Sequence, residues 1–148
     1  MVCLPSSPNW SPDGNWIAFR RCDEQIWIMD TLGGSLTNLT RNGMRNGLPV
    51  WSPDGWRIAY AATLSPGVTT WQFYTMNADG SNQVQLTHDP VGAVDPTWSP
   101  DGRRIAYAGG CCDAETMDIY IVNADGSGQP TNITNTPKLA ERWPAWRP

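Results

Sequence analysis

Very few side chains in this sequence could catalyse a reaction. His88 is the only histidine, and histidine is the residue that most often acts as a general base near neutral pH. It precedes Asp89 in a short polar segment, and such a His-Asp pair arises easily by chance. No Gly-x-Ser-x-Gly motif is present, so the nucleophile-bearing turn of the α/β-hydrolases is missing. We therefore predict no catalytic residue and no enzymatic activity for this chain.

The sequence also predicts no site for a metal ion or a cofactor. It has four cysteines, at positions 3, 22, 111 and 112, and their spacing fits no zinc motif. We interpret Cys111 and Cys112 as two free thiols in a loop, with a strained vicinal disulfide as the alternative. Residues 77–81 resemble the start of a calcium loop, but residues 82–87 add no acidic ligand. The glycines fall in predicted turns, and none forms a phosphate-binding loop.

Binding fits the available residue types better than catalysis does, and four side chains are the candidates. Arg41, Arg45 and Arg142 lie near one end of the predicted repeats. A guanidinium group at these positions would pair with the carboxylate of an acidic partner. Trp71 would add an aromatic contact surface. An equally economical interpretation is that these side chains form a solvated surface.

The bulk composition narrows the classes of partner. The chain has 148 residues, of which 40% are hydrophobic and 16% charged, so we expect one folded domain. Its formal net charge is −4, and no five-residue run of Lys and Arg occurs, which argues against nucleic acid. No apolar stretch approaches the roughly 18 residues of a membrane span. The N-terminal residues show neither a basic region nor an apolar one, so no signal peptide is visible.

An internal repeat must position all of these residues. The motif Trp-Ser-Pro-Asp-Gly begins at Trp10, Trp51 and Trp98, and a fourth copy begins at Trp146. Each complete copy is followed by Ile-Ala-Tyr or Ile-Ala-Phe, by a second run of aromatic and β-branched residues, and by Leu-Thr or Ile-Thr. Each repeat therefore predicts four short strands separated by turns.

The repeated motif has a physical reason for its residue types. Proline presets the second position of a type I turn, aspartate suits the third, and glycine takes the left-handed conformation at the end. We interpret Asp13, Asp54 and Asp101 as residues that bond to the backbone of this turn, with an acidic rim for cations or a basic partner as the alternative. A four-stranded unit cannot bury both faces alone, so the recurring tryptophans should pack between neighbouring units.

The combination of Trp-Ser-Pro-Asp-Gly, Ile-Ala-Tyr and Asn-Ala-Asp-Gly-Ser resembles the WD40-like Pro-Asp repeat (PD40) of TolB-type β-propellers over residues 7–148. The expected fold is all-β, with blades at about 7–47, 48–94 and 95–142 and the first strand of a fourth blade at 143–148. Each blade should be a four-stranded antiparallel sheet. In this family, TolB is a periplasmic six-bladed propeller that binds protein partners. The resemblance therefore implies a periplasmic or extracellular chain that binds a protein or peptide.

Other functions and assemblies remain open at this point. Similar repeats form the substrate-gating propellers of prolyl-oligopeptidase-like serine peptidases, whose catalytic domain would follow Pro148. A sugar- or small-ligand-binding propeller would use Trp16, Trp56 or Trp71 for stacking. Three blades are fewer than a closed ring needs. We interpret the chain first as part of a longer protein, second as half of a homodimeric six-bladed ring, and third as an open arc.

Overall fold

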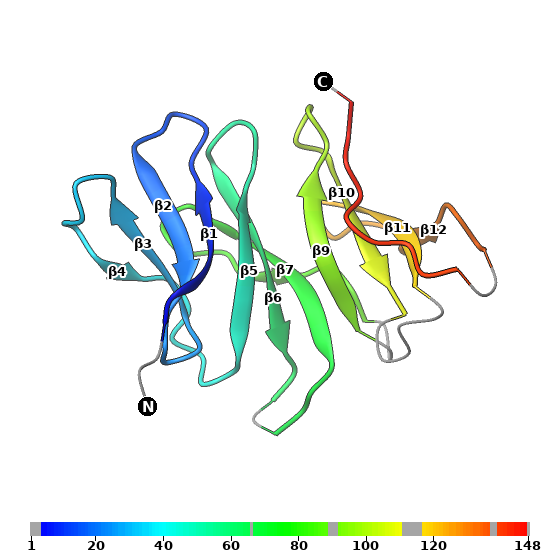
Figure 1. Cartoon of the computed structure of the whole chain (residues 1–148), viewed down its shortest axis with the longest axis horizontal. Helices are drawn as coiled ribbons and strands as arrows, with labels where there is room; N and C mark the ends of the chain where they lie inside the picture. The colour runs from blue at the N-terminus through cyan, green and yellow to red at the C-terminus, as the bar shows by residue number, and fades with distance from the viewer. Residues whose placement is uncertain (1–3, 66, 89–91, 111–116, 137–138, 148) are drawn as a thin grey trace.

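The computed structural model of the chain describes residues 4–65, 67–88, 92–110, 117–136 and 139–147. These residues form twelve strands and no helix. The strands build three four-stranded antiparallel sheets, in which neighbouring strands follow one another along the chain. Figure 1 shows the sheets side by side as successive blades. The predicted all-β fold with three four-stranded antiparallel blades is therefore confirmed.

The fourth, outermost strand is the shortest in each blade. Blade 1 consists of β1 (Ser6–Trp10), β2 (Trp16–Arg20), β3 (Ile26–Asp30) and β4 (Thr37–Asn38). Blade 2 consists of β5 (Asn46–Trp51), β6 (Arg57–Thr63), β7 (Trp71–Asn77) and β8 (Val84–Gln85). Blade 3 consists of β9 (Ala93–Trp98), β10 (Arg104–Gly109), β11 (Asp118–Asn123) and β12 (Thr131–Asn132). The first strands β1, β5 and β9 pack beside one another and form the inner side of the arc.

Serine and aspartate side chains hold the turn between the first and second strands of each blade. In blade 2, Ser52 Oγ donates a hydrogen bond to Asp54 Oδ1 at 2.6 Å, and the same oxygen accepts one from the Trp56 N–H at 3.0 Å. The glycine that follows the aspartate has φ between +67° and +74° in the three blades, a conformation that suits glycine best. The same bonds recur at Asp13 and Asp101, which confirms the predicted turn role of these aspartates.

The recurring tryptophans fill the space between blades. Trp51 and Trp98 end β5 and β9 and are only 8% and 6% exposed. Each joins a core cluster formed by two neighbouring blades. Trp10, which ends the first strand of the first described blade, is 57% exposed. Burying an aromatic side chain of this kind contributes about 2 to 3 kcal/mol, so the predicted packing role is confirmed for the two buried residues.

The Leu-Thr segment of each repeat fastens the outer edge of the blade. Thr40 Oγ1 accepts a hydrogen bond from the Ile26 N–H at 2.8 Å, and Thr87 Oγ1 accepts one from the Phe73 N–H at 2.9 Å. Both threonine side chains are buried, and so are the N–H groups that they satisfy. The threonine therefore continues the backbone ladder where the fourth strand has already ended.

Each inner strand contains a bulge in front of a proline. The pairing register shifts within β1, β5 and β9. At these bulges Ser7, Leu48 and Asp95 have φ of +55°, +53° and +57°, and each precedes a proline. Proline has no N–H to donate to a ladder, so a bulge in the first strand of a sheet is a place where it fits. Non-glycine residues at such φ carry backbone strain on the order of 1 to 3 kcal/mol.

Residues 143–147 occupy the position expected for the first strand of a fourth blade. Trp143 repeats the positive φ, at +53°, and again precedes a proline. Trp146 Nε1 donates a hydrogen bond to the Thr97 carbonyl at 3.2 Å, as the repeated tryptophan does one blade earlier. The segment makes these packing contacts without forming a ladder, since the described residues contain no second strand for it to pair with.

Two further features bear on the environment of the chain. Cys22 is disulfide-bonded, whereas the other three cysteines, including the predicted free thiols Cys111 and Cys112, lie outside the described residues. No helix in the described part of the chain has the length and apolar character needed to cross a membrane.

Candidate functional site

The inner side of the arc forms a shallow cavity from equivalent residues of successive repeats. This cavity has a volume of about 310 Å³. Its wall includes the residue that precedes the proline of the inner segment in each repeat, namely Ser7, Leu48, Asp95 and Trp143. These are the four strained positions of the inner strands. The repeat therefore presents the same backbone distortion four times along one surface, which we call the inner surface.

Arg142 lies at one end of the inner surface but is already engaged by the protein itself. Its Nε is 3.4 Å from Asp95 Oδ2, and its guanidinium lies 5.4 Å from the centre of the Trp143 ring. The contact with Asp95 is an ion pair without hydrogen-bond geometry, because this buried oxygen has no hydrogen-bond partner among the described residues.

Arg45 and Trp71 form a separate cluster beside the inner surface. The Arg45 guanidinium lies 5.5 Å from the Trp71 ring centre, and its Nε is 3.0 Å from Glu24 Oε1. Glu24 also pairs with Arg20 at 2.8 Å. Trp71 and Arg20 line a cavity of about 180 Å³ that shares Leu48 with the inner surface. The structure thus brings two of the four predicted binding residues together.

Arg41 stands apart from both groups. It is exposed, and within the described residues no ion pair involves it. The roles of Arg41, Arg45, Arg142 and Trp71 in partner binding stay a prediction.

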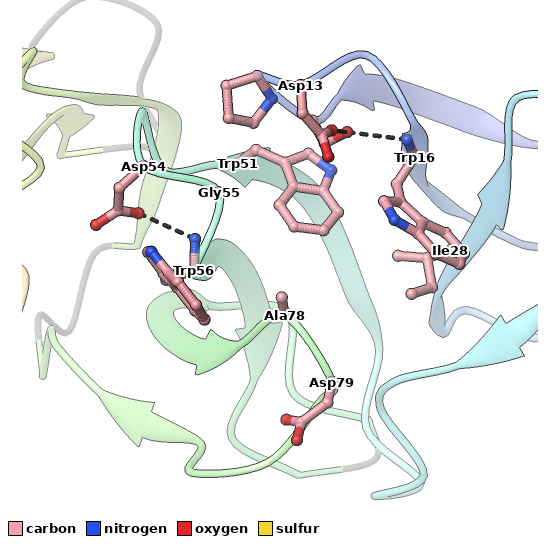
Figure 2. A pocket seen from close by; sticks show the side chains of 11 residues that line it. Asp13, Trp16, Ile28, Trp51, Asp54, Gly55, Trp56, Ala78 and Asp79 are labelled. Atoms are coloured by element: carbon pink, nitrogen blue, oxygen red, sulfur yellow. Dashed lines mark hydrogen bonds between the residues drawn. The ribbon is translucent and has the colours of Figure 1, made fainter.

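A larger cavity lies between blades 1 and 2, on the face that carries the Pro-Asp-Gly turns. It has a volume of about 520 Å³. We call it the first-seam cavity. Its walls are three tryptophans, three aspartates and small or aliphatic residues: Trp16, Trp51, Trp56, Asp13, Asp54, Asp79, Ser11, Pro12, Ile28, Gly55 and Ala78. Figure 2 shows Trp51 in the middle of the site, with Trp16 and Ile28 of blade 1 on one side and Trp56 of blade 2 on the other.

The carboxylates of the first-seam cavity are negatively charged at neutral pH. The hydrogen bond from Ser11 is the main cause that lowers the pKa of Asp13, and the hydrogen bond from Ser81 does the same for Asp79. Desolvation alone would raise the pKa of Asp54, but hydrogen bonds from Ser52 and Trp56 and the charge of Arg57 outweigh it and lower that pKa as well. No Lys or Arg lines the cavity. The site therefore concentrates negative charge between aromatic walls.

One polar atom of this site has no partner. Trp51 is 8% exposed, and its Nε1 is buried without a hydrogen-bond partner among the described residues. The equivalent atom of Trp98 donates to the Val50 carbonyl at 3.0 Å. A buried donor without a partner costs free energy, so a ligand that supplies an acceptor would relieve it.

The chemistry available at these surfaces is binding chemistry. In the described residues no group of three or more His, Cys, Asp or Glu could hold a metal ion. His88 is exposed, and its neighbour Asp89 lies outside the described residues. Carboxylates facing indole rings suit a cation, because both the charge and the ring faces attract it. Sequence reasoning identified the aspartates and weighed them as a rim, but it did not place Trp51 beside them, since that contact joins two repeats.

Comparison with known proteins places these features in a family. A family model described as "TolB beta propeller domain" matches residues 3–148. The chain is 41% identical over 66 residues to the uncharacterized peptidase YuxL of Bacillus subtilis, covering 42% of this chain and 10% of that protein. It is 34% identical over 77 residues to the Tol-Pal system protein TolB of Francisella tularensis, covering 49% of this chain and 18% of that protein. The chain thus spans less than a fifth of the length of these relatives.

Solved structures agree on the fold. The chain superposes on a putative TolB from Agrobacterium tumefaciens with a TM-score of 0.71 and 24% identity, over 89% of this chain and 49% of that one. It superposes on an acylaminoacyl peptidase with a TM-score of 0.60 and 19% identity, over 88% of this chain and 25% of that one. At these identities the likeness shows the propeller fold alone.

Proposed function

This chain belongs to the TolB β-propeller family, and from that membership we propose that it is a non-enzymatic module that binds a protein or peptide partner. The first-seam cavity is the observation that carries the proposal. At about 520 Å³ it has the size of a ligand site. Its tryptophans and carboxylates are groups that bind a ligand, and the residues that line it include no histidine, cysteine or lysine. Tol-Pal TolB proteins are among the relatives, which supports a protein as the ligand.

A selection from random peptides tests this proposal while the partner is still unidentified. A phage-displayed library is panned on the immobilised chain, and enriched sequences are synthesised and measured by fluorescence anisotropy. We expect dissociation constants on the order of micromolar. Trp56→Ser removes an exposed wall of the first-seam cavity and should weaken binding, whereas Leu32→Ser, at a residue that is 97% exposed in a turn, should not.

Two results would contradict the proposal. One is a selection in which no peptide binds above the level of an unrelated control protein. The other is cleavage of the bound peptides by the purified chain, detected by mass spectrometry, because a binding module leaves its ligand intact.

We also propose that the chain works outside the cytoplasm. The disulfide at Cys22 supports this location, because disulfides persist in oxidising compartments and are rare in reducing ones. The resemblance to Tol-Pal TolB proteins points the same way. Thiol alkylation before and after reduction, followed by mass spectrometry of protein from its native cells, tests it. Full alkylation of Cys22 without reduction would contradict an oxidising location.

A second candidate function has its own support. The similarity to the peptidase YuxL and the fold shared with acylaminoacyl peptidase favour a propeller that controls access to a peptidase active site. This function requires a hydrolase domain in the same polypeptide. Sequencing the gene beyond the codon for Pro148 tests it. A Gly-x-Ser-x-Gly segment there would favour the peptidase, and its absence over several hundred codons would favour the binding module.

A further inference from the structure

The second strand of each blade begins with a residue at the same place, but the three repeats do not use the same type. The position is two residues after the turn glycine and is occupied by Trp16, Arg57 and Arg104. Arg57 extends from blade 2 to blade 3. Its Nη2 donates to the Gly102 carbonyl at 2.7 Å, and its Nη1 donates to the Ala124 carbonyl at 3.2 Å. We call the contact between blades 2 and 3 the second seam. The guanidinium of Arg57 fills it.

The guanidinium of Arg57 is also held by an aromatic ring. It lies 4.9 Å from the centre of the Trp98 ring. Thr75 contributes a hydroxyl 3.5 Å from the same Ala124 carbonyl. Two carbonyl oxygens and one indole face therefore form a guanidinium site at this seam.

The first seam, between blades 1 and 2, has counterparts of the two carbonyl groups and the indole ring but no guanidinium. Gly55, Ala78 and Trp51 are the counterparts of the two carbonyl residues and the ring in the second seam. All three line the first-seam cavity. Trp16 replaces the arginine, and Ile28 replaces the threonine. Neither replacement carries a cation, so the cavity of about 520 Å³ lies where the second seam has its own side chain.

The charges around the two seams agree with this comparison. Asp125 in the second seam has its pKa lowered mainly by Ser127, with the charge of Arg57 as a further cause. Its counterpart Asp79 lines the first-seam cavity, where only hydrogen bonds lower its pKa. The first-seam cavity thus keeps the negative charge but has no guanidinium in its own wall, although the charge of Arg57 reaches Asp54 at its edge.

We propose that the first-seam cavity binds the guanidinium group of an arginine side chain that belongs to the protein or peptide partner. The arginine would donate to the Gly55 and Ala78 carbonyls and stack on the indole of Trp51, as Arg57 does one seam further. The inference rests on the proposed function and specifies its ligand.

A small probe isolates the chemistry. N-acetyl-arginine amide carries the guanidinium and two carbonyl groups, and N-acetyl-citrulline amide is nearly isosteric but uncharged. Binding is followed through the tryptophan indole N–H signals in ¹H–¹⁵N NMR spectra. We expect saturable binding of the arginine probe with a dissociation constant on the order of millimolar. The citrulline probe should bind at least about tenfold more weakly, because charge-assisted hydrogen bonds and cation–π contacts are lost.

Trp16→Arg gives the decisive variant. The new guanidinium should occupy the first seam as Arg57 occupies the second, and binding of the arginine probe should be lost. Blades 2 and 3 carry arginine at this position, so the substitution is compatible with the fold. Leu32→Arg is the matched control: it adds the same charge at a turn residue that is 97% exposed and does not line the cavity, and it should leave binding intact.

The second seam provides a reciprocal test. Arg57→Ala should open a second site, so that the variant binds two arginine probes where the natural chain binds one. If this variant does not fold, the Trp16→Arg and Leu32→Arg pair still decides the question.

The proposal would be overturned by equal binding of the citrulline probe, which would indicate recognition of a neutral ligand such as a sugar or amide. Retained binding by Trp16→Arg would overturn it as well. If the peptide selection succeeds but its peptides bind equally well with citrulline in place of arginine, the binding function stands and this assignment fails. If no peptide binds, the binding function itself fails.

Discussion

Trp51 and Trp98 occupy the same place in successive repeats but differ in one hydrogen bond. Trp98 Nε1 donates to the Val50 carbonyl at 3.0 Å, whereas Trp51 Nε1 is buried without a partner among the described residues. Replacing either indole by a phenyl ring removes similar apolar area. We therefore expect Trp98→Phe to lower the free energy of unfolding by about 1 to 3 kcal/mol more than Trp51→Phe does, since only the first leaves a buried carbonyl without its donor. Urea denaturation followed by circular dichroism gives both values. Equal losses would mean that Trp51 has an acceptor after all.

The turn aspartates link the stability of the chain to pH. Hydrogen bonds from serine side chains are the main causes that lower the pKa values of the turn residues Asp13, Asp79, Asp101 and Asp125. A hydrogen bond from Asn132 does the same for Asp118, which begins β11. A carboxyl group whose pKa is lower in the folded state stabilises the fold fully above its unfolded pKa of about 3.9. This contribution is lost as the pH falls through the lower folded value. We expect the urea midpoint to be nearly constant from pH 7 to about pH 5 and to fall steeply below about pH 4.

One serine substitution tests the cause. Ser99→Ala removes the hydroxyl that donates to Asp101 at 2.5 Å, so the pKa of Asp101 should rise toward its ordinary value. ¹³C NMR titration of the aspartate carboxyl groups measures it. Ser65→Ala, at an exposed serine elsewhere in the chain, is the control and should leave the pKa of Asp101 unchanged. A pKa of Asp101 that does not move in Ser99→Ala would assign the lowering to the Arg103 N–H instead.

The threonine at the end of each repeat shows how one element depends on the next. Thr87 Oγ1 accepts the buried Phe73 N–H, and Thr134 Oγ1 accepts the less buried Ile119 N–H, both at 2.9 Å. Valine has the same shape but no acceptor. We expect Thr87→Val to cost about 1 to 3 kcal/mol, because a buried donor is left unsatisfied. Thr134→Val should cost less than about 1 kcal/mol, because water can reach its donor.

Hydrogen exchange provides a second measurement of the same effect. The Phe73 amide should exchange faster in Thr87→Val than in the natural chain, while amides of blade 1 keep their rates. Similar losses of stability in the two threonine variants would show that the burial of the accepted N–H group does not decide the cost.

Much of each element followed from the sequence, and the misses have physical reasons. The Trp-Ser-Pro-Asp-Gly motif predicted the first turn, the strands beside it and the role of Asp13, because all of these depend on residues close in sequence. The first-seam cavity depends on contacts between repeats, and sequence reasoning did not find it. Its signal was present as Trp16, which stands where the other repeats have Arg57 and Arg104. The positive φ before each inner proline was also missed, since a residue before proline is ordinarily extended.

At the scale of the whole molecule, the repeat predicted the class of fold but not its closure. The number of blades follows from counting the complete copies of the motif, because each of these builds one sheet. Closure depends on what covers the two outermost blade faces. Trp10 at one end is 57% exposed, and the segment with Trp146 lies against blade 3 at the other end.

The two ends of the chain compete for the same contact with an outermost blade face. Trp10 of a second copy would need the place that Trp146 holds, where its Nε1 bonds to the Thr97 carbonyl and its ring lies 5.1 Å from the Arg104 guanidinium. We therefore expect the chain to show only weak, concentration-dependent association in light scattering after size-exclusion chromatography. Deleting residues 143–148 frees that place and should produce a defined dimer. A head-to-tail contact of this kind closes when both ends of each copy are used.

Trp10 identifies the contact in that experiment. Adding Trp10→Ser to the deletion should return the mass to that of a monomer, because the serine cannot fill the site between two blades. Leu32→Ser, at an exposed turn residue outside this contact, should leave the dimer intact. A natural chain that is already a stable dimer would show that residues 143–147 yield to the partner's first strand, and the inner surface would then be the wall of a closed channel. Long filaments from the deleted chain would show that the two arcs associate without closing, and the missing blades would have to come from another polypeptide segment.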